Sequence, residues 1–567
     1  MVLGPVFKLL EVVFDLCTPI IVAMMIDRGV GGRDVHAVVM YGAMLAVMAL
    51  VGFGFTLVCQ KMASLASQGM GTDMRDALFT HINELSHADI DRFGTPTLIT
   101  RITGDINQVQ LAVALGIRQL IRFPLLAVGS MIAALAIDLE LGLVFLVATP
   151  LVCLVFWVVM ARCVPLFKLV QCKLDRVGLI TREGLLGARV VRAFVREDHE
   201  HERFAVAADE QAAASILVGR LSSVLNPATM LIMNLAVCAI LWTGGLRVEV
   251  GGLTQGQVMA FVNYMTQTLL AIVYVANLVV VFTKASASAS RVIEVLDCEP
   301  SIVDAVDAGG VEPAAVCTPQ DASAPAIRMR QVSFSFAGAS APALRDISLE
   351  LPIGGTLGVI GGTGAGKSTL VSLIPRLYDV SSGVVEVFGR DVRSWSIPAL
   401  RGAVGLVPQR AQLVSGTIRS NLLWRNADAS DDELWEALEV AQAADFVRAL
   451  STGLDAPIEA GGKNFSGGQR QRLTIARALV GNPAMLILDD SSSALDAKTD
   501  AELRAALSQL PLTTVIVSQR VSSVRDADLI CVLYHGAIAG LGTHDELLAS
   551  CDIYREIVDS QLKREVS

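Results

Sequence analysis

Long hydrophobic segments dominate the first half of the chain. Six of them are long enough to cross a bilayer, which takes about 20 apolar residues. They lie at residues 2–26, 35–58, 117–137, 139–164, 227–245 and 257–283. Polar stretches at 60–116 and 165–226 interrupt the series after the second and fourth segments. Both contain few Pro or Gly, so we expect them to continue the spanning helices, because structureless loops of this length are uncommon.

The second half of the chain has a different pattern. Residues 299–326 are rich in Ala, Pro, Gly, Asp and Ser, which is typical of a linker. Short β-branched runs then alternate with helical segments, and this alternation predicts a largely parallel sheet flanked by helices. The expected strands are 357–360, 404–407, 486–488 and 514–517. The predicted fold class is a six-span α-helical transmembrane domain with long helical extensions, fused to an α/β domain.

Composition and charge narrow the class of protein. The chain of 567 residues is 53% apolar with a mean hydropathy of +0.56, which indicates a membrane protein with a soluble part. A formal charge of −10 argues against a nucleic-acid partner. Lys and Arg concentrate in the second polar stretch, so the positive-inside tendency places the long stretches in the cytosol. The ten Cys lack CxxC spacing, and we interpret them as small apolar residues.

A phosphate-binding motif follows the first expected strand. It consists of Gly361, Gly362, Thr363, Gly364, Ala365, Gly366, Lys367, Ser368 and Thr369, with a helical segment directly after it. This is a complete P-loop in the strand–loop–helix context that it requires. Its glycines let backbone N–H groups converge on phosphate oxygens, Lys367 reaches the outer phosphates, and Ser368 reaches Mg²⁺. The placement of Lys-Ser-Thr argues against a chance glycine-rich turn.

The strand at 486–488 ends in Asp489, as expected of a carboxylate that holds Mg²⁺. This pattern is weak alone and strong downstream of a P-loop. We therefore expect ATP and Mg²⁺ as cofactors of an α/β P-loop NTPase domain. The predicted division is a transmembrane domain at 1–283, a connecting helix end and linker at 284–326, and a nucleotide-binding domain at 327–567.

A further motif identifies the kind of NTPase. It is formed by Ser466, Gly467, Gly468 and Gln469. At this point the chain resembles the ATP-binding-cassette family, specifically exporter-type half-transporters in which six spans are fused to one nucleotide-binding cassette. The resemblance covers essentially the whole chain, and Ser-Gly-Gly-Gln, the family signature, is its most specific element. It implies residence in the cytoplasmic membrane with the cassette in the cytosol.

Other residues match the family in order. The resemblance implies that Phe336 stacks on adenine, although a core aromatic is the alternative for this residue taken alone. It implies that Gln409 joins Ser368 and Asp489 at the Mg²⁺ site. The loop that crosses to the partner cassette is matched by Ser493, Ala494, Leu495 and Asp496. Residues 91–93 and 187–194 resemble the tips of two cytosolic projections, which in such exporters dock on the cassettes.

Two positions depart from the family pattern. Asp490 stands where most hydrolysing members have Glu, and Gln519 stands where they have His. A general base must lie within about 3 Å of the water that it activates, and Asp is one methylene too short. Gln cannot become cationic as His can. In this family one subunit's P-loop faces the other's signature, so the pattern predicts the degenerate-site subunit of a heterodimeric exporter, with a second half-transporter as partner.

Two other functions stay open: a homodimeric exporter with slow turnover, and an ATP-gated channel or regulatory membrane protein. The six spans exclude a soluble cassette ATPase, and the fusion of spans to the cassette disfavours an importer. The spans are lined by Val, Ile, Leu, Met and Ala. This composition suits a hydrophobic or amphipathic substrate and contact with membrane lipid.

Two carboxylates within the first span are candidates for the substrate cavity. Glu11 and Asp15 are one turn apart on the same helix face. A carboxylate inside a span normally faces the bundle interior or water. Lys8 can pair with Glu11, and the alternative for that pair is an interfacial anchor with no substrate role. Asp15 has no partner nearby in the sequence. We expect Asp15 to face the translocation cavity and to favour cationic or zwitterionic amphiphiles.

Overall fold

The computed structural model describes residues 3–304 and 324–566. Two compact units emerge. The helical unit comprises Met1–His81 and Pro96–Asp297, and the cassette unit comprises Ile82–Thr95 and Cys298–Ser567. Most of the expected linker, residues 305–323, lies outside the described residues.

Six continuous helical segments of the helical unit are long and apolar enough to cross a membrane, which confirms the six predicted spans. The polar stretches extend these helices, as expected. The α-helices in the six spanning segments are α1 (Leu3–Met24), α2 (Val35–Glu84), α4 (Thr95–Thr100), α5 (Ile106–Leu115), α6 (Arg122–Ile137), α7 (Leu139–Leu186), α9 (Glu197–Ser223), α10 (Leu225–Glu249) and α11 (Gln255–Leu296). The 50 residues of α2 span about 75 Å at 1.5 Å each, far beyond a hydrocarbon core of about 30 Å.

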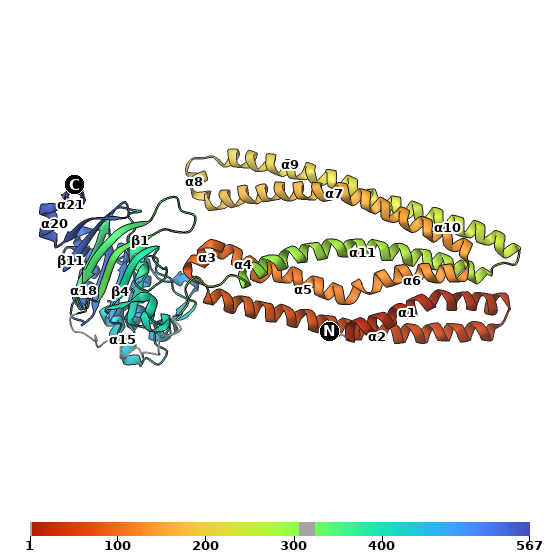
Figure 1. Cartoon of the computed structure of the whole chain (residues 1–567), viewed down its shortest axis with the longest axis horizontal. Coiled ribbons are helices and arrows are strands. Elements are labelled where there is room, and N and C mark those ends of the chain that lie inside the picture. Colours follow the sequence, from red (N-terminus) through yellow and green to blue (C-terminus); the bar gives the residue numbers. More distant parts are fainter. Residues whose placement is uncertain (1–2, 305–323, 567) are drawn as a thin grey trace. The chain divides into compact units, whose positions relative to one another are not determined.

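Long-range contacts hold this helical unit together. Helix α7 runs alongside α9 and α10, and α11 packs on α1, α5 and α6 (Figure 1). A buried cluster around Phe145, Phe261 and Tyr264 joins α7 to α11. Asp138 begins α7 by accepting hydrogen bonds from Glu140 N and Leu141 N, both at 3.0 Å. These interactions fix which helix faces turn inward.

The cassette contains two sheets. The six-stranded sheet has the order β12-β11-β3-β10-β9-β6, in which only the edge strand β12 is antiparallel to its neighbour. Its strands are β3 (Thr356–Gly361), β6 (Val404–Val407), β9 (Met485–Asp489), β10 (Thr513–Ser518), β11 (Leu529–Tyr534) and β12 (Ala537–Gly542). All four predicted strands are in it. The antiparallel sheet β2-β1-β4-β5 contains β1 (Ile327–Phe334), β2 (Leu344–Leu351), β4 (Ser382–Val387) and β5 (Arg390–Asp391).

The helices of the cassette cover the parallel sheet, as its apolar strands require, or pack against the helices that cover it. They are α12 (Lys367–Leu373), α13 (Ile397–Ala403), α14 (Ile418–Leu422), α15 (Asp431–Val440), α16 (Ala444–Arg448), α17 (Gly467–Leu479), α18 (Ala497–Leu507), α19 (Val521–Val524), α20 (His544–Ser550) and α21 (Asp552–Val566). Every residue of β9 is buried, because this strand pairs on both edges and is covered on both faces. Such a strand can hold a terminal carboxylate at a fixed point.

Candidate nucleotide-binding site

Three parallel strands bring the predicted site together. Strand β10 lies between β3 and β9, with Ser518 opposite Ile360 and Val517 opposite Asp489. The carboxyl ends of parallel strands meet at one edge of a sheet, where open α/β folds bind ligands. The P-loop follows β3, Asp489 ends β9, and Gln519 follows β10. Residues far apart in the sequence therefore share this edge.

The P-loop needs glycine where the backbone is left-handed or crowded. Gly366, at the start of α12, has φ +96°, and a Cβ there would lie 2.8 Å from the carbonyl oxygen of Ala343. At Gly361 a Cβ would lie 2.3 Å from the carbonyl oxygen of Leu533 on β11. Both contacts are too short for a side chain. The glycines thus keep the loop close to the sheet and leave its N–H groups free of side-chain cover.

Lys367 lies beneath this loop. Its Nζ donates to the carbonyl oxygens of Gly361 and Gly362, each at 2.9 Å. Burial lowers the pKa of the Lys367 ammonium, although the nearby charges of Asp490 and Asp489 oppose the shift. A buried ammonium is costly unless it is paired. An anionic phosphate at the loop would supply that partner.

Ser368 and Asp489 form the candidate metal site. The Ser368 hydroxyl donates to Asp489 Oδ1 at 3.0 Å. Burial raises the pKa of the Asp489 carboxyl, and the hydrogen bond from Ser368 acts in the opposite direction. Hydroxyl and carboxylate oxygens are the hard ligands that Mg²⁺ prefers. The residues present therefore fit a magnesium ion bound together with phosphate.

Asp490 and Gln409 meet at the same edge. Gln409 Nε2 donates to Asp490 Oδ2 at 3.2 Å, and the N–H of Asp490 donates to the carbonyl oxygen of Val517 at 2.9 Å. The backbone of Asp490 is left-handed, with φ +46°. Its main chain is thus fixed by β10, and only its short side chain reaches outward. The contact with Gln409 joins two residues that are 81 positions apart in the sequence.

A pocket of about 350 Å³ contains these groups. It is lined by Phe336, Ala343, Thr363, Gly364, Ala365, Gly366, Lys367, Ser368, Thr369, Gln409, Asp489, Asp490, Val517 and Gln519. Gln519 is exposed at this pocket, and its carbonyl oxygen accepts a hydrogen bond from Gln561. The Phe336 ring is 40% exposed, so it is not part of the buried core.

The signature motif begins a helix elsewhere on the cassette. The Ser466 side chain accepts from Gln469 N at 3.2 Å, and Ser466 N donates to Gln469 Oε1 at 2.9 Å, which is a capping box at the start of α17. Ser466 and Gly467 are exposed. Among the described residues, none of the signature residues lines the P-loop pocket. An exposed helix N-terminus can bind an anion that another chain presents.

The segment after Asp490 lies against the signature. A Cβ on Gly468 would lie 3.1 Å from the carbonyl oxygen of Ala494. Leu495 is buried, and Asp496 caps α18 by accepting from Thr499 N at 3.1 Å. The side chain of Ser493 lies outside the described residues. The predicted inter-cassette loop therefore adjoins the signature motif within this chain.

Comparisons with known proteins agree with these observations. Residues 1–273 match the ABC transporter transmembrane region, and residues 344–493 match the ABC transporter family model. An uncharacterized ABC transporter ATP-binding protein of Mycobacterium tuberculosis is 37% identical over 563 residues, covering 98% of this chain and 94% of that protein. The chain belongs to the ABC transporter family.

Two further ABC proteins place it among exporters. An ATP-dependent lipid A-core flippase of Syntrophus aciditrophicus is 30% identical over 504 residues, covering 88% of this chain and 82% of that protein. The structure of a bacterial Atm1-family ABC exporter with ATP bound aligns with a TM-score of 0.79, covering 98% of each chain. At 22% identity, that structure shows the shared fold. This ABC protein is a multi-pass exporter subunit of the cell membrane, with its cassette in the cytosol.

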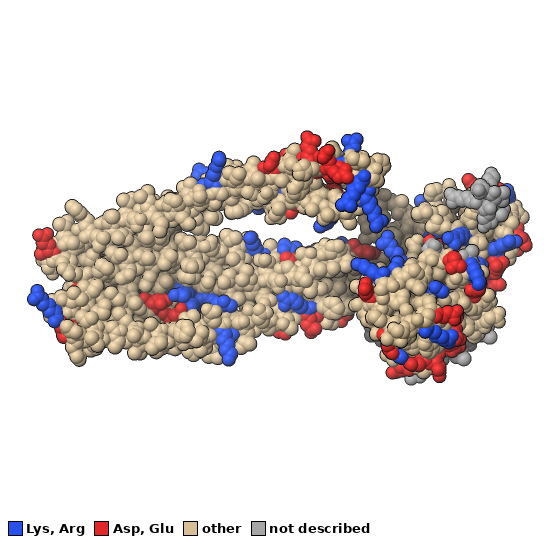
Figure 2. Space-filling view, turned by 180° about the vertical axis from the view of Figure 1, so that it is seen from behind, with Lys and Arg blue, Asp and Glu red and all other residues tan. Residues whose placement is uncertain are grey.

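The membrane carboxylates of this ABC exporter have partners. Lys8 Nζ lies 2.7 Å from Glu11 Oε2, and Arg122 lies 3.3 Å from Glu11 and 3.0 Å from Asp15 Oδ2. Lys8 and Glu11 are buried, whereas the side chains of Asp15 and Arg122 are about one-third exposed. Asp15 has no partner nearby in the sequence, and in the fold α6 supplies Arg122 as its partner. Figure 2 shows charged side chains gathered amid the uncharged residues of the helical unit.

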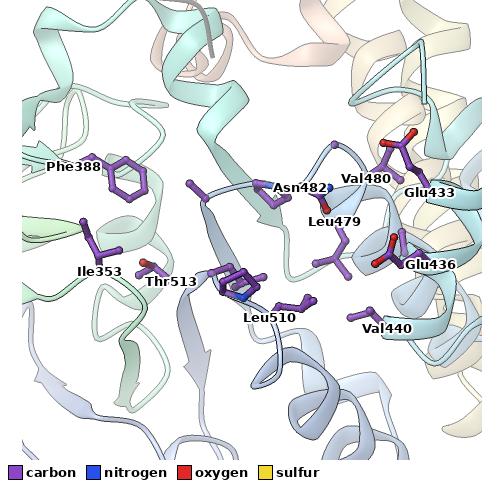
Figure 3. Close-up of a pocket in the computed structure, with 16 residues that line it drawn as sticks. Ile353, Phe388, Glu433, Glu436, Val440, Leu479, Val480, Asn482, Leu510 and Thr513 are labelled. Atoms are coloured by element: carbon purple, nitrogen blue, oxygen red, sulfur yellow. The ribbon is translucent and has the colours of Figure 1, made fainter. Parts of the chain in front are cut away.

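A second cavity of about 280 Å³ lies at the opposite edge of the parallel sheet, where β9 and β10 begin. Figure 3 shows apolar side chains around it, including Leu479 and Leu510, with Glu433 and Glu436 on one side. Glu433 accepts hydrogen bonds from Ser430 at the start of α15. This carboxylate serves the helix cap, and the described lining of this cavity shares no residue with that of the nucleotide pocket.

Proposed function

We propose that this chain is the degenerate-site subunit of a heterodimeric ABC exporter. Its P-loop, Ser368 and Asp489 hold ATP and Mg²⁺, with Gln409 beside them and Phe336 against the adenine. The Mg²⁺ ion offsets negative charge on the phosphates when it is bound. Hydrolysis at this pocket is slow, and the chain contributes its signature to a faster site on a partner subunit.

The observation that carries this proposal is the position of Asp490. Its main chain is fixed by the hydrogen bond to Val517, and its carboxylate contacts Gln409 at 3.2 Å. A side chain one methylene shorter than Glu cannot extend farther from that fixed point. Misplacement of a catalytic group by about 1 Å can reduce a rate about 100-fold. Gln519 lines the same pocket, so both departures affect one site.

The intact signature supports the other half of the proposal. Ser466 and Gln469 form a complete cap at an exposed helix start, and they lie outside the described lining of their own pocket. The signature is complete although it does not line the nucleotide pocket of its own chain. This arrangement is expected of a nucleotide site that two chains form together. A homodimer with slow turnover is the alternative that this geometry also permits.

The proposed substrate is an amphipathic lipid or similar molecule. The relative from Syntrophus is named as a lipid A-core flippase, and the spans of this chain are apolar. The Asp15–Arg122 pair presents one negative and one positive charge, each about one-third exposed. We do not expect a preference for purely cationic substrates, because the positive charge of Arg122 neutralises the negative charge of Asp15. We therefore favour a zwitterionic head group at the Asp15–Arg122 pair over a cationic one.

ATPase assays test the pairing. The purified full chain alone should release phosphate slowly from Mg²⁺-ATP, and co-purification with the cognate half-transporter should restore turnover. In the heterodimer, Ser466→Arg should remove most activity, whereas Asp490→Ala or Gln519→Ala should lower it modestly. Loss of a well-placed catalytic group typically costs about 10²–10⁴-fold, and a site that already lacks both groups has little to lose. Fast turnover by the chain alone would refute the assignment.

Transport assays separate a pump from a channel. Proteoliposomes that contain the heterodimer and a fluorescent phosphatidylethanolamine should translocate that lipid when Mg²⁺-ATP is supplied. Translocation should stop when the partner's hydrolysis is blocked. Movement that needs bound ATP but continues without hydrolysis would instead indicate an ATP-gated channel.

A further inference from the structure

A short helix from the membrane half of the sequence belongs to the cassette unit. Helix α3 (His87–Phe93) lies between the second and third spans in sequence, yet Ile82–Thr95 groups with the cassette. Ser86 caps α3 with a capping box in which Asp89 is the reciprocal partner. The helix is therefore structured locally and held by the cassette.

Asp89 joins α3 to the segment that follows the last span. Its Oδ2 accepts from Ser86 N at 3.0 Å, Ser86 Oγ at 2.7 Å, Ser301 N at 3.0 Å and Ser301 Oγ at 3.1 Å. Burial tends to raise the pKa of this carboxyl, but the hydrogen bonds from Ser301 and Ser86 outweigh it, so the pKa is lowered. The carboxylate is charged at neutral pH and holds both segments.

Tyr378 is the point where the cassette contacts α3. Its hydroxyl donates to Asp91 Oδ2 at 2.7 Å, and the His87 ring lies edge-on to its ring at 6.3 Å between centroids. His87 and Asp91 are four residues apart, so they share one face of α3. Burial, aided by the hydrogen bond to Asp91, raises the pKa of Tyr378 to about 12, so the hydroxyl remains a donor.

The same ring also contacts the proposed adenine platform. Phe336 lies edge-on to Tyr378 at 5.6 Å, and Phe334 at 5.5 Å completes the cluster. Arg376 fixes the turn that carries Tyr378, because it pairs with Asp379 at 2.8 Å and donates to the carbonyl oxygen of Val303. One rigidly mounted side chain thus touches both an adenine-site aromatic and α3.

We propose that Tyr378 is a positioning residue that transmits occupancy of the adenine site to α3. The inference rests on the proposed nucleotide function. A base stacked on Phe336 restricts that ring, which restricts Tyr378 through its edge-on contact. Tyr378 in turn holds Asp91 and His87 in place. The adenine, not the phosphates, is then the part of the nucleotide that α3 senses, since Gln409 and Asp490 lie at the phosphate end.

Hydrogen exchange in α3 tests this link in the purified full chain. Amide exchange of residues 87–93 is measured without ligand, with Mg²⁺-ATP, and with Mg²⁺-tripolyphosphate, which lacks the base. ATP should slow exchange about threefold to tenfold, because one hydrogen bond contributes about that much to an equilibrium. Tripolyphosphate should leave the exchange of α3 unchanged. ATP affinity is measured on the same samples.

Four variants isolate the contact. Tyr378→Phe keeps the ring against Phe336 and removes the hydroxyl, so ATP affinity should stay within about twofold while the response of α3 is lost. Asp91→Ala should lose the response, and Asp91→Asn should retain it, because an amide oxygen still accepts. Tyr534→Phe is the matched control, since it removes an exposed phenol hydroxyl that is not among the described lining of the nucleotide pocket.

The exchange and affinity measurements distinguish a failure of the Tyr378 link from a failure of the nucleotide function. If ATP binds but Tyr378→Phe responds like the parent, the link through Tyr378 is wrong and the nucleotide site stands. An equal response to tripolyphosphate would show that α3 senses the phosphates, which also overturns the inference. If the parent binds no ATP at all, the proposed nucleotide function fails, and this inference fails with it.

Discussion

If the proposed degenerate site limits turnover, giving the chain the Glu and His of most hydrolysing relatives should raise its ATPase activity. The change is Asp490→Glu combined with Gln519→His. Glu adds one methylene, about 1.5 Å, to a side chain whose main chain is fixed by Val517. That extension moves the carboxylate outward, toward the contact of about 3 Å that a general base requires. The chain's own signature is intact, so a homodimer of the double variant would contain two complete sites.

The expected gain follows from the role of a general base. Such a group contributes about 10²–10⁴-fold, which is about 3–5 kcal/mol of barrier at about 1.4 kcal/mol per tenfold. We expect turnover of the purified double variant to rise at least about 100-fold over the parent. Asp490→Glu alone should give most of this gain, since it supplies the general base.

Phosphate release from Mg²⁺-ATP measures the effect, with the oligomeric state determined on the same sample. Adding Ser466→Arg to the double variant is the control, because it removes the signature from each composite site and should abolish the gain. A dimeric double variant that binds ATP yet turns over no faster than the parent would refute the assignment of Asp490 as the limiting group.

Three further perturbations test the structure itself. Gly366→Ala should weaken ATP binding and lower the free energy of unfolding by about 1–3 kcal/mol, because φ is +96° and a Cβ would meet Ala343. Gly402→Ala is the control and should be harmless, because a Cβ there would meet open space. Thermal unfolding and ATP titration measure both variants. Glu11→Gln should destabilise the helical unit by about 3 kcal/mol, since it leaves the buried Lys8 ammonium without its carboxylate partner, and the more exposed Asp15→Asn should cost clearly less. Because hydrogen bonds lower the pKa of Asp89 below its ordinary 3.8, its contribution is complete above that value and is lost only as pH falls through the lowered pKa. The difference in α3 exchange between Asp89→Asn and the parent should therefore be constant from pH 8 to pH 5, and a difference that changes across this range would contradict the assignment.

Local patterns in the sequence determined most of the architecture and the parts of the nucleotide site. Uninterrupted apolar runs specify spans, because a lipid-crossing helix must satisfy its own backbone and cover it with apolar side chains. Strand β3, the P-loop and α12 are contiguous, so strand, glycines and lysine can be read in order. Asp489 was predictable for the same reason: a carboxylate that ends a buried strand must lie at the sheet edge.

Tertiary structure alone decided which distant side chains meet. Gln409 and Asp490 are 81 residues apart, Arg122 and Asp15 are 107 apart, and Tyr378 and Asp91 are 287 apart. Periodicity gives the face of a helix on which a residue lies, but it does not give the partner helix or its register. Asp15 therefore looked unpaired until the packing of α6 against α1 brought Arg122 beside it. The same reasoning applies to Tyr378, whose significance depends on α3 reaching the cassette.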